Sequence, residues 1–392
     1  MVPSSASILH ACFLLLFWSD RLYANVNECY SSIISFGDSI ADTGNLKKLD
    51  SISDVWFPCP TPYGQNFIGQ TTGRCTNGRL IIDFLAESLG LPLVQPYLRA
   101  KGSGGGASLR QGVNYAVVGA TALDSSFLEA KWHNYPMVNT SLEVQLSWFK
   151  QSLPSICGNT SDCRNFIGRS LILLGHIGGN DYNLPFSEGK KIDEIKPYVT
   201  LVIKVIISVL NELIAMGARS LVVPGNFPVG CFPSVLTVYE SHNEEYDPIT
   251  GCLTKFNEFA EYHNTMLQAK LNQIRELNPN VVIMYADYYN SLMQIYNSPH
   301  EYGFTKKGTL NACCGCGEQY NFNMTRICGG ECFNICDEPD TYVSWDGMHF
   351  TEATYKSMFK SLFQGPYITP EFYSQCPTKP ISQVGITLSK SI

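Results

Sequence analysis

Ser39, Asp346 and His349 are the residues of this sequence whose types and spacing could together perform acyl transfer. Ser39 stands in S-I-I-S-F-G-D-S-I-A-D-T-G-N, residues 32–45, where an apolar run gives way to a glycine-containing turn. A serine between the end of a strand and the start of a helix lies close to free backbone N–H groups, which can bind an oxyanion. The pattern predicts a nucleophile, although a Gly-Asp-Ser turn by itself is more often only a turn.

A serine nucleophile needs a general base, and His349 is the histidine best placed to supply one. It follows Asp346 by three residues in V-S-W-D-G-M-H-F, just before a predicted helix that starts near Thr351. An aspartate at this spacing can accept the Nδ1 proton of the imidazole and leave Nε2 to face the serine. The alternative is that Asp346 caps a turn and His349 is half-exposed.

Three groups are predicted to bind the oxyanion, namely the N–H of Ser39, the N–H of Gly119 and the side-chain amide of Asn180. His176, close to Asn180 in sequence, is a rival histidine for contact with the substrate or for the role of base. The remaining histidines of the mature chain are interpreted as surface or packing residues: His133, His242, His263 and His300.

Strands that alternate with helices are expected to bring these residues to one edge of a sheet. Apolar runs predict strands that end at residues 36, 118, 174 and 223, and a further strand at 281–285. Helical spacing predicts helices at 80–89, 197–216 and 256–277. This order is typical of a parallel sheet covered on both faces, with ligands beyond the carboxyl ends of its strands. Residues 47–76 are interpreted as a long loop near the site, and residues 25–392 as a single domain.

The N-terminus and the cysteines indicate a secreted protein. Residues 1–24 have the features of a signal peptide. Their apolar run, residues 11–18, is too short to span a bilayer. A membrane anchor or a buried segment is the alternative. Its removal takes away Cys12 and leaves 14 of the 15 cysteines, an even number that fits a disulfide framework. N-glycosylation sequons agree with the secretory route, and they begin at Asn139, Asn159 and Asn323.

Two disulfides are predicted from local spacing, Cys157 with Cys163 and Cys231 with Cys252. A dense cluster is interpreted as disulfides in a long surface loop, with a zinc site as the alternative: Cys313, Cys314, Cys316, Cys328, Cys332 and Cys336. The net charge of −7 without long charge runs disfavours nucleic acid and anionic membranes as partners. No stable membrane span is predicted.

Six blocks in order along the chain resemble the plant GDSL esterase/lipase family of SGNH hydrolases: F-G-D-S-I-A-D-T-G-N, G-R-C-T-N-G-R-L-I-I-D-F, N-Y-A-V-V-G-A-T-A-L, I-G-G-N-D-Y-N, V-P-G-N-F-P-V-G-C and Y-V-S-W-D-G-M-H-F-T-E-A. The resemblance implies a flavodoxin-like three-layer α/β/α sandwich with a mostly parallel sheet. It also implies hydrolysis of carboxylic esters without a metal or other cofactor.

By the same resemblance Ser39 is the nucleophile, Gly119 and Asn180 are oxyanion donors, and Asp346 and His349 complete the triad. Ile40 replaces the leucine of the family motif, and Val118 stands where many relatives have a glycine, so that the donor could lie one residue from Gly119. The blocks V-N-Y-A-V-V-G-A-T-A-L-D and Y-A-D-Y-Y-N look most like the acetylajmalan esterase type, which deacetylates plant alkaloids.

The sequence thus predicts a secreted or vacuolar serine esterase for a small-molecule ester, with a short acyl group on a plant specialised metabolite such as an alkaloid. Three alternatives remain at this point, of which an intracellular metal-binding module is the most remote. An acyltransferase would use the same acyl-enzyme, and a carbohydrate- or lipid-binding protein would keep the fold without turnover.

Overall fold

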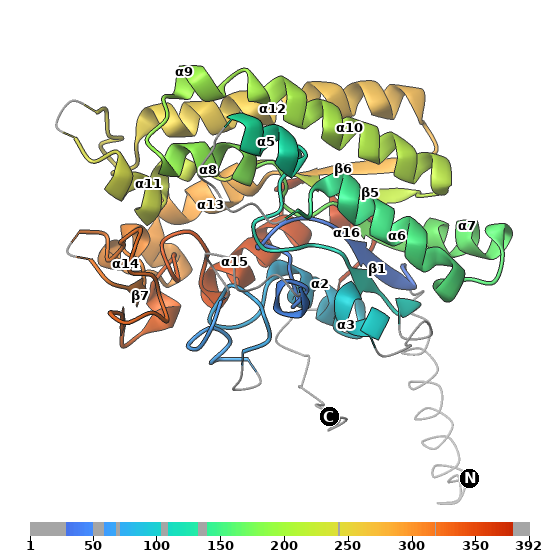
Figure 1. Cartoon of the computed structure of the whole chain (residues 1–392), viewed down its shortest axis with the longest axis horizontal. Coiled ribbons are helices and arrows are strands. Elements are labelled where there is room, and N and C mark those ends of the chain that lie inside the picture. Colours follow the sequence, from blue (N-terminus) through green and yellow to red (C-terminus); the bar gives the residue numbers. More distant parts are fainter. Residues whose placement is uncertain are drawn as a thin grey trace, which may run out of the picture.

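A seven-stranded sheet forms the centre of the computed structural model, which describes residues 29–49, 59–67, 71–102, 109–131, 139–241, 244–317 and 319–378 (Figure 1). The predicted signal peptide lies outside the described residues. The strands, in spatial order, are β2 (Gln95–Pro96), β3 (Val113–Asn114), β1 (Ser32–Ser35), β4 (Ser170–Leu173), β5 (Ser220–Pro224), β6 (Val282–Ala286) and β9 (Ile368–Thr369). All neighbours are parallel except β6 and β9.

The five strands β3-β1-β4-β5-β6 have the flavodoxin-like order, in which the first strand of the chain lies between the second and the third. Ile34 of β1 lies opposite Val113 of β3 on one side and Ile172 of β4 on the other. All three side chains are fully buried, as expected for a sheet covered on both faces. Ligands bind at the point where the strand order reverses, beyond the carboxyl ends of β1 and its neighbours.

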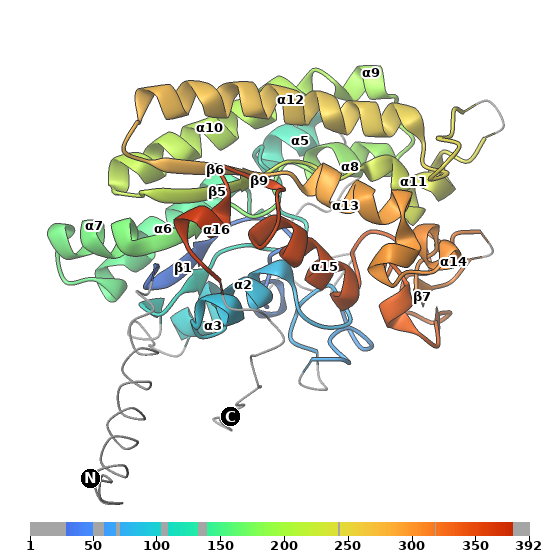
Figure 2. The ribbon, with the colours of Figure 1, turned by 180° about the vertical axis from the view of Figure 1, so that it is seen from behind.

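Helices cover both faces of the sheet (Figures 1 and 2), which confirms the predicted α/β/α sandwich. On one face lie α6 (Leu142–Ile156), α10 (Tyr198–Met216) and α12 (Thr254–Leu277), and on the other α2 (Ile81–Leu89) and α15 (Glu352–Phe363). The remaining α-helices are α3 (Tyr97–Gly102), α5 (Ser125–Lys131), α7 (Thr160–Arg169), α8 (Asn180–Ser187), α9 (Ile192–Ile195), α11 (Pro233–Val238), α13 (Tyr288–Asn297), α14 (Lys306–Leu310) and α16 (Phe372–Gln375).

The predicted strands and helices agree with the structure to within a few residues, except that the apolar run 113–118 forms a strand only over β3. Gly90 and Gly217 end α2 and α10 in the left-handed conformation, with φ of 72° and 118°. Segment 192–216, α9 with α10, is the one stretch of the described chain with the length and composition to cross a membrane. Here α10 packs against α6 and α12, while Lys204, Asn211 and Glu212 stay exposed.

Seven disulfides join the 14 cysteines outside the predicted signal peptide. Both locally predicted pairs form, Cys157–Cys163 and Cys231–Cys252. The cysteine cluster pairs within itself, as the disulfide interpretation predicted: Cys313–Cys336, Cys314–Cys328 and Cys316–Cys332, around the small sheet of β7 (Cys314–Gly315) and β8 (Asn334–Ile335). Spacing did not predict the other two, Cys59–Cys75 and Cys29–Cys376.

Candidate active site

Ser39 lies in a tight turn directly after β1. Gly37 has a φ of +136°, and a Cβ there would stand 2.9 Å from the carbonyl oxygen of His176, so that only glycine lets the two loops approach. The N–H of Asp38 donates to that same oxygen at 2.9 Å, and the Asp38 carboxylate accepts from the N–H of Ile40 at 3.0 Å. Ser39 is 7% exposed, and its own N–H has no hydrogen-bond partner among the described residues.

Asp42 joins the serine turn to the loop that follows β3. Its buried carboxylate accepts from the N–H groups of Gly44, Asn45 and Leu46, and also from Val118 at 3.0 Å. Burial raises the pKa of Asp42 to about 6, although these four N–H groups favour the ionised form. The N–H of Val118 is therefore occupied.

The N–H of Gly119, in contrast, has no partner in the described part of the chain, and Gly119 takes the left-handed conformation with a φ of +78°. The geometry thus favours Gly119 over Val118 as a donor to an outside atom.

Asn180 is the first residue of α8, and it joins the loops after β3 and β4. Its Nδ2 donates to the carbonyl oxygen of Ala120 at 2.9 Å, and an amide nitrogen carries two hydrogens, so that a second donor remains. The next residue, Asp181, accepts from the N–H groups of Ala122 and Leu123 at 2.8 and 2.9 Å. The three predicted oxyanion donors thus belong to loops that are bonded to one another.

Asp346 and His349 form a buried pair on the turn before α15. Asp346 Oδ2 accepts from His349 Nδ1 at 2.6 Å, while Oδ1 accepts from the N–H groups of Met348 and His349 at 2.9 and 2.7 Å. Burial would raise the pKa of Asp346, but the charge and hydrogen bonds of His349 outweigh it and hold the pKa below its ordinary value. An ionised Asp346 fixes the proton on Nδ1 and makes Nε2 the accepting nitrogen.

Aromatic packing places the Asp346–His349 turn beside the serine turn. The Asp38 carboxylate bonds His176, whose ring lies 4.8 Å from that of Phe227, and Phe227 lies 4.9 Å from Phe350, the neighbour of His349. Tyr355 of α15 supports this arrangement, because its pKa is raised well above the ordinary value by burial and then by the charges of Asp346 and Asp38. Ser39, Gly119 and Asn180 thus lie in loops at the strand ends, and this chain of contacts links the serine turn to the turn that carries Asp346 and His349.

The other histidines take no comparable position. Both ring nitrogens of His176 are engaged, Nδ1 with Asp38 at 2.7 Å and Nε2 with Asn226 Oδ1 at 2.9 Å, so His176 supports the serine turn instead of acting as a base. Burial, with a smaller effect from His176, lowers the pKa of His263 to about 3, and its Nδ1 bonds Tyr182. His300 is exposed, and His133 and His242 lie outside the described residues.

Sequence reasoning missed one residue that touches this pair. The hydroxyl of Tyr63 donates to Asp346 Oδ2 at 2.8 Å across 283 positions of chain. The loop 47–76 was expected near the site, but no spacing rule singles out one tyrosine in P-T-P-Y-G, because the contact depends on how the loop folds back.

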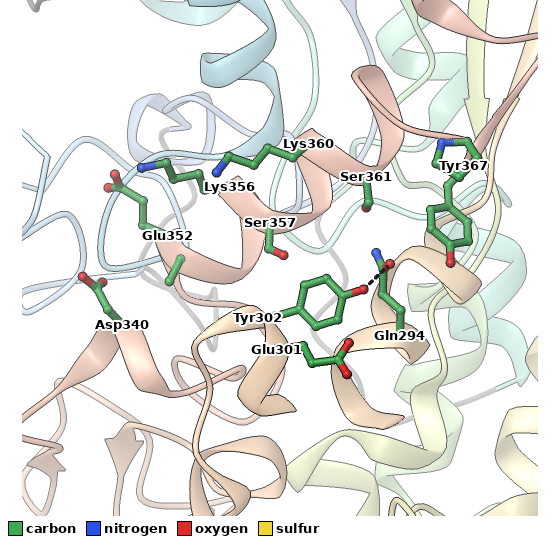
Figure 3. A pocket seen from close by; sticks show the side chains of 12 residues that line it. Gln294, Glu301, Tyr302, Asp340, Glu352, Lys356, Ser357, Lys360, Ser361 and Tyr367 are labelled. Atoms are coloured by element: carbon green, nitrogen blue, oxygen red, sulfur yellow. Dashed lines mark hydrogen bonds between the residues drawn. The ribbon is translucent and has the colours of Figure 1, made fainter. Parts of the chain in front are cut away.

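A surface groove of about 700 Å³ lies beside α13, α15 and the 3₁₀ turn Pro299–Tyr302 (Figure 3). Figure 3 shows polar side chains around it, with Tyr302 donating to Gln294 at 2.8 Å and Lys356 and Lys360 along α15. None of the five predicted site residues lines this groove. It is thus distinct from the candidate active site.

Comparisons with known proteins agree with the geometry. The sequence profile of the GDSL-like lipase/acylhydrolases matches residues 33–362. The GDSL esterase/lipase At1g28580 of Arabidopsis thaliana is 48% identical over 98% of this chain and 99% of its own length. The GDSL esterase/lipase At1g31550 of the same plant is 52% identical over 91% of this chain and 89% of its own.

Among solved structures, a mutant acetyl-xylooligosaccharide esterase from Geobacillus Stearmophilus matches with a TM-score of 0.27 and 15% identity, over 69% of this chain and 80% of that one. A likeness at that level carries no argument about fold or substrate. The family profile, the plant relatives and the sheet order lead to one conclusion: the chain belongs to the GDSL esterase/lipase family and is a carboxylic ester hydrolase.

Proposed function

We propose that this hydrolase cleaves its ester through an acyl-enzyme on Ser39. His349 Nε2 takes the hydroxyl proton as Ser39 Oγ bonds the carbonyl carbon, and the oxyanion is held by the N–H groups of Ser39 and Gly119 and by the Asn180 amide. As the ester C–O bond breaks, the leaving alcohol takes the proton from His349. A water molecule then attacks the acyl-enzyme with His349 again as base, which releases the acid and restores Ser39.

The observation that carries this proposal is the 2.6 Å hydrogen bond between Asp346 and His349, in a turn that ring contacts through Phe350 and Phe227 link to the His176–Asp38 pair beside Ser39. The carboxylate orients the imidazole and stabilises the imidazolium that forms during each proton transfer. The N–H groups of Ser39 and Gly119, which have no hydrogen-bond partner among the described residues, add a binding site for developing negative charge. A binding protein without turnover would have no use for this combination.

The substrate is a small-molecule ester with a short acyl group, such as an acetyl ester of a plant specialised metabolite of the alkaloid class. Ser39 and His349 are only 7% and 6% exposed, which supports a narrow approach to the nucleophile. A narrow approach favours a small acyl group because a long chain would need an apolar channel beside Ser39.

The protein enters the secretory pathway through a signal peptide, residues 1–24, which is then removed; it folds as one domain over 25–392 and works in the apoplast or the vacuole. Seven disulfides support an oxidising compartment. Asn323 carries a glycan, since its side chain already bonds the N–H and hydroxyl of Thr325, both at 2.9 Å. The other two sequon asparagines, Asn139 and Asn159, are exposed and carry glycans as well.

The test is hydrolysis of nitrophenyl esters from acetate to palmitate by the wild-type protein and by Ser39→Ala, with His349→Ala in parallel. We expect a preference for acetate, and loss of nearly all turnover in both variants at unchanged folding. A serine-directed fluorophosphonate should label the wild-type protein and not Ser39→Ala.

Other results of these experiments would contradict the proposed function or change it. Wild-type activity in Ser39→Ala would remove the nucleophile assignment. Labelling of Ser39 without hydrolysis, together with ester formation when an alcohol is added, would make the protein an acyltransferase. A preference for palmitate would contradict the short acyl group.

A further inference from the structure

Tyr63 contacts the proposed triad, although the mechanism above gives it no part. Its hydroxyl and His349 Nδ1 both donate to Asp346 Oδ2, at 2.8 and 2.6 Å. Two backbone N–H groups, those of Met348 and His349, donate to Oδ1. Four donors fill the accepting positions of the two oxygens, so that Tyr63 stands where a water molecule would otherwise bind the carboxylate.

The loop around Tyr63 holds its hydroxyl in place. The ring is 1% exposed and stands edge-on against Trp345 at a centroid distance of 6.1 Å. The N–H of Tyr63 donates to Pro60 at 2.8 Å, and the disulfide Cys59–Cys75 closes the loop. A hydroxyl on so fixed a ring cannot turn away from Asp346.

The same loop is tied to the turn that carries His349. Thr76 Oγ1 donates to the carbonyl oxygen of Phe350 at 2.9 Å, and the N–H of Gly64 donates to Thr76 at 2.8 Å. A Cβ on Gly329 would meet Thr61 at 2.8 Å, so the cystine-rich segment packs against this loop too. Tyr63 and Asp346 therefore stay in fixed register although they are far apart in sequence.

Its surroundings keep the Tyr63 hydroxyl in the neutral form, which donates a hydrogen bond. Burial raises its pKa well above the ordinary value for tyrosine, and the negative charge of Asp346 raises it further. Tyr355 on α15 is a further ionisable group near the pair, since the charges of Asp346 and of Asp38, which is bonded to His176, both raise its pKa. Of these, Tyr63 is the one whose hydroxyl donates to the Asp346 carboxylate.

We propose that Tyr63 is a positioning residue that locks the Asp346 carboxylate and draws part of its charge away from His349. The inference rests on the proposed roles of Asp346 and His349. A hydrogen bond from Tyr63 weakens the attraction of the carboxylate for a proton on the imidazole, so His349 stays neutral, and able to act as base, at a lower pH. The protein would then keep its activity under mildly acidic conditions.

Tyr63→Phe removes the hydroxyl and keeps the ring. We expect kcat to fall about tenfold, because a carboxylate without this hydrogen bond can turn and holds the His349 imidazole less firmly in its reactive orientation, with KM changed by less than about twofold. The acid limb of the kcat/KM profile should move to higher pH. Tyr115→Phe is the matched control, because Tyr115 is equally buried but bonds Ser152 at 2.6 Å and not a carboxylate.

Two further measurements separate positioning from structural support. In the Asp346→Asn background, Tyr63→Phe should have little added effect on kcat, because no carboxylate is left to hold. Histidine NMR should show His349 gaining its proton at higher pH in Tyr63→Phe than in the wild-type protein. A variant with only a lower melting temperature, and with wild-type kcat and pH profile, would overturn the inference.

The NMR readout also separates this inference from the proposed function. If Ser39→Ala abolishes turnover but Tyr63→Phe leaves the His349 titration unchanged, the function stands and the role of Tyr63 is wrong. If the wild-type protein shows no Ser39-dependent turnover, the function fails, and a shifted His349 titration still supports the coupling of Tyr63 to the pair.

Discussion

Single side chains at this site are distinguished by how completely their hydrogen-bonding groups are used. Asp346 has both oxygens filled, and both nitrogens of His176 are engaged, so neither is open to a ligand. Asn180 differs, because its amide makes one bond, to Ala120, and keeps a second donor. At the residue scale, therefore, a hydrogen-bond donor that is still available distinguishes a candidate ligand-binding residue better than burial does.

Asn180→Ala should lower kcat by about two to three powers of ten, which is typical for the loss of one oxyanion donor, with a small change in KM. Steady-state kinetics on the best nitrophenyl ester would measure this. Asn278→Ala is the matched control, since its amide also donates to a backbone carbonyl, Ile274 at 3.0 Å, but at the end of α12. Equal losses in the two variants would contradict a role in oxyanion binding.

At the scale of elements, buried carboxylates fasten three strand-end loops together. Asp42 joins the loop after β1 to that after β3, and Asp181 at the start of α8 joins the loop after β3 to that after β4. Parallel strands end at the same edge of the sheet, but their loops need such bonds to hold donors in register. Asp181 lies beside Asn180, so its state affects the site directly.

Burial raises the pKa of Asp181 to about 7, against the hydrogen bonds from Leu123 and Ala122. Because its pKa is raised, Asp181 binds a proton more tightly in the folded than in the unfolded state. Proton binding by Asp181 therefore adds fully to the free energy of unfolding below about pH 4, and this contribution is lost as the pH rises to about 7. Asp181→Asn should therefore flatten the fall in stability between pH 4 and 7.

Guanidinium unfolding at several pH values would measure the slope for Asp181→Asn. Asp287→Asn, which replaces a partly exposed carboxylate at the start of α13, is measured in parallel. An unchanged slope in Asp181→Asn would show that Asp181 is ionised across this range in both states.

At the scale of the whole molecule, disulfides act at two distances from the site. The disulfide of Cys314 lies in a segment whose backbone contacts the turn of Asp346. In this contact the N–H of Cys314 donates to the carbonyl oxygen of Trp345 at 2.6 Å. Cys29–Cys376 instead closes nearly the whole described chain, with a separation of 347 residues. A long closed loop restricts the unfolded chain most.

The double variant Cys29→Ser/Cys376→Ser should lose roughly 2–5 kcal/mol of unfolding free energy while kcat at 25 °C stays close to wild type. Cys157→Ser/Cys163→Ser, which opens a separation of only 6 residues, should lose less. Denaturant unfolding and ester hydrolysis measure the two effects. A large drop in kcat for the first variant would mean that the chain ends influence the site.

The sequence by itself determined the strand and helix pattern and two disulfides, and it predicted the five site residues. These features are local: apolar periodicity sets each element, a glycine-bounded turn sets Ser39, and Asp346 and His349 lie three residues apart on one turn. Short edge strands such as β2 and β9 were missed because two-residue pairings carry no period.

Only the tertiary structure decided which backbone donors are free and which distant groups meet. Val118 and Gly119 look equivalent in sequence until Asp42 takes one N–H, and Tyr63 reaches Asp346 only because a cross-linked loop folds back over the turn. Such contacts join residues tens to hundreds of positions apart. No local preference of the chain encodes them, since they depend on the packing of whole elements.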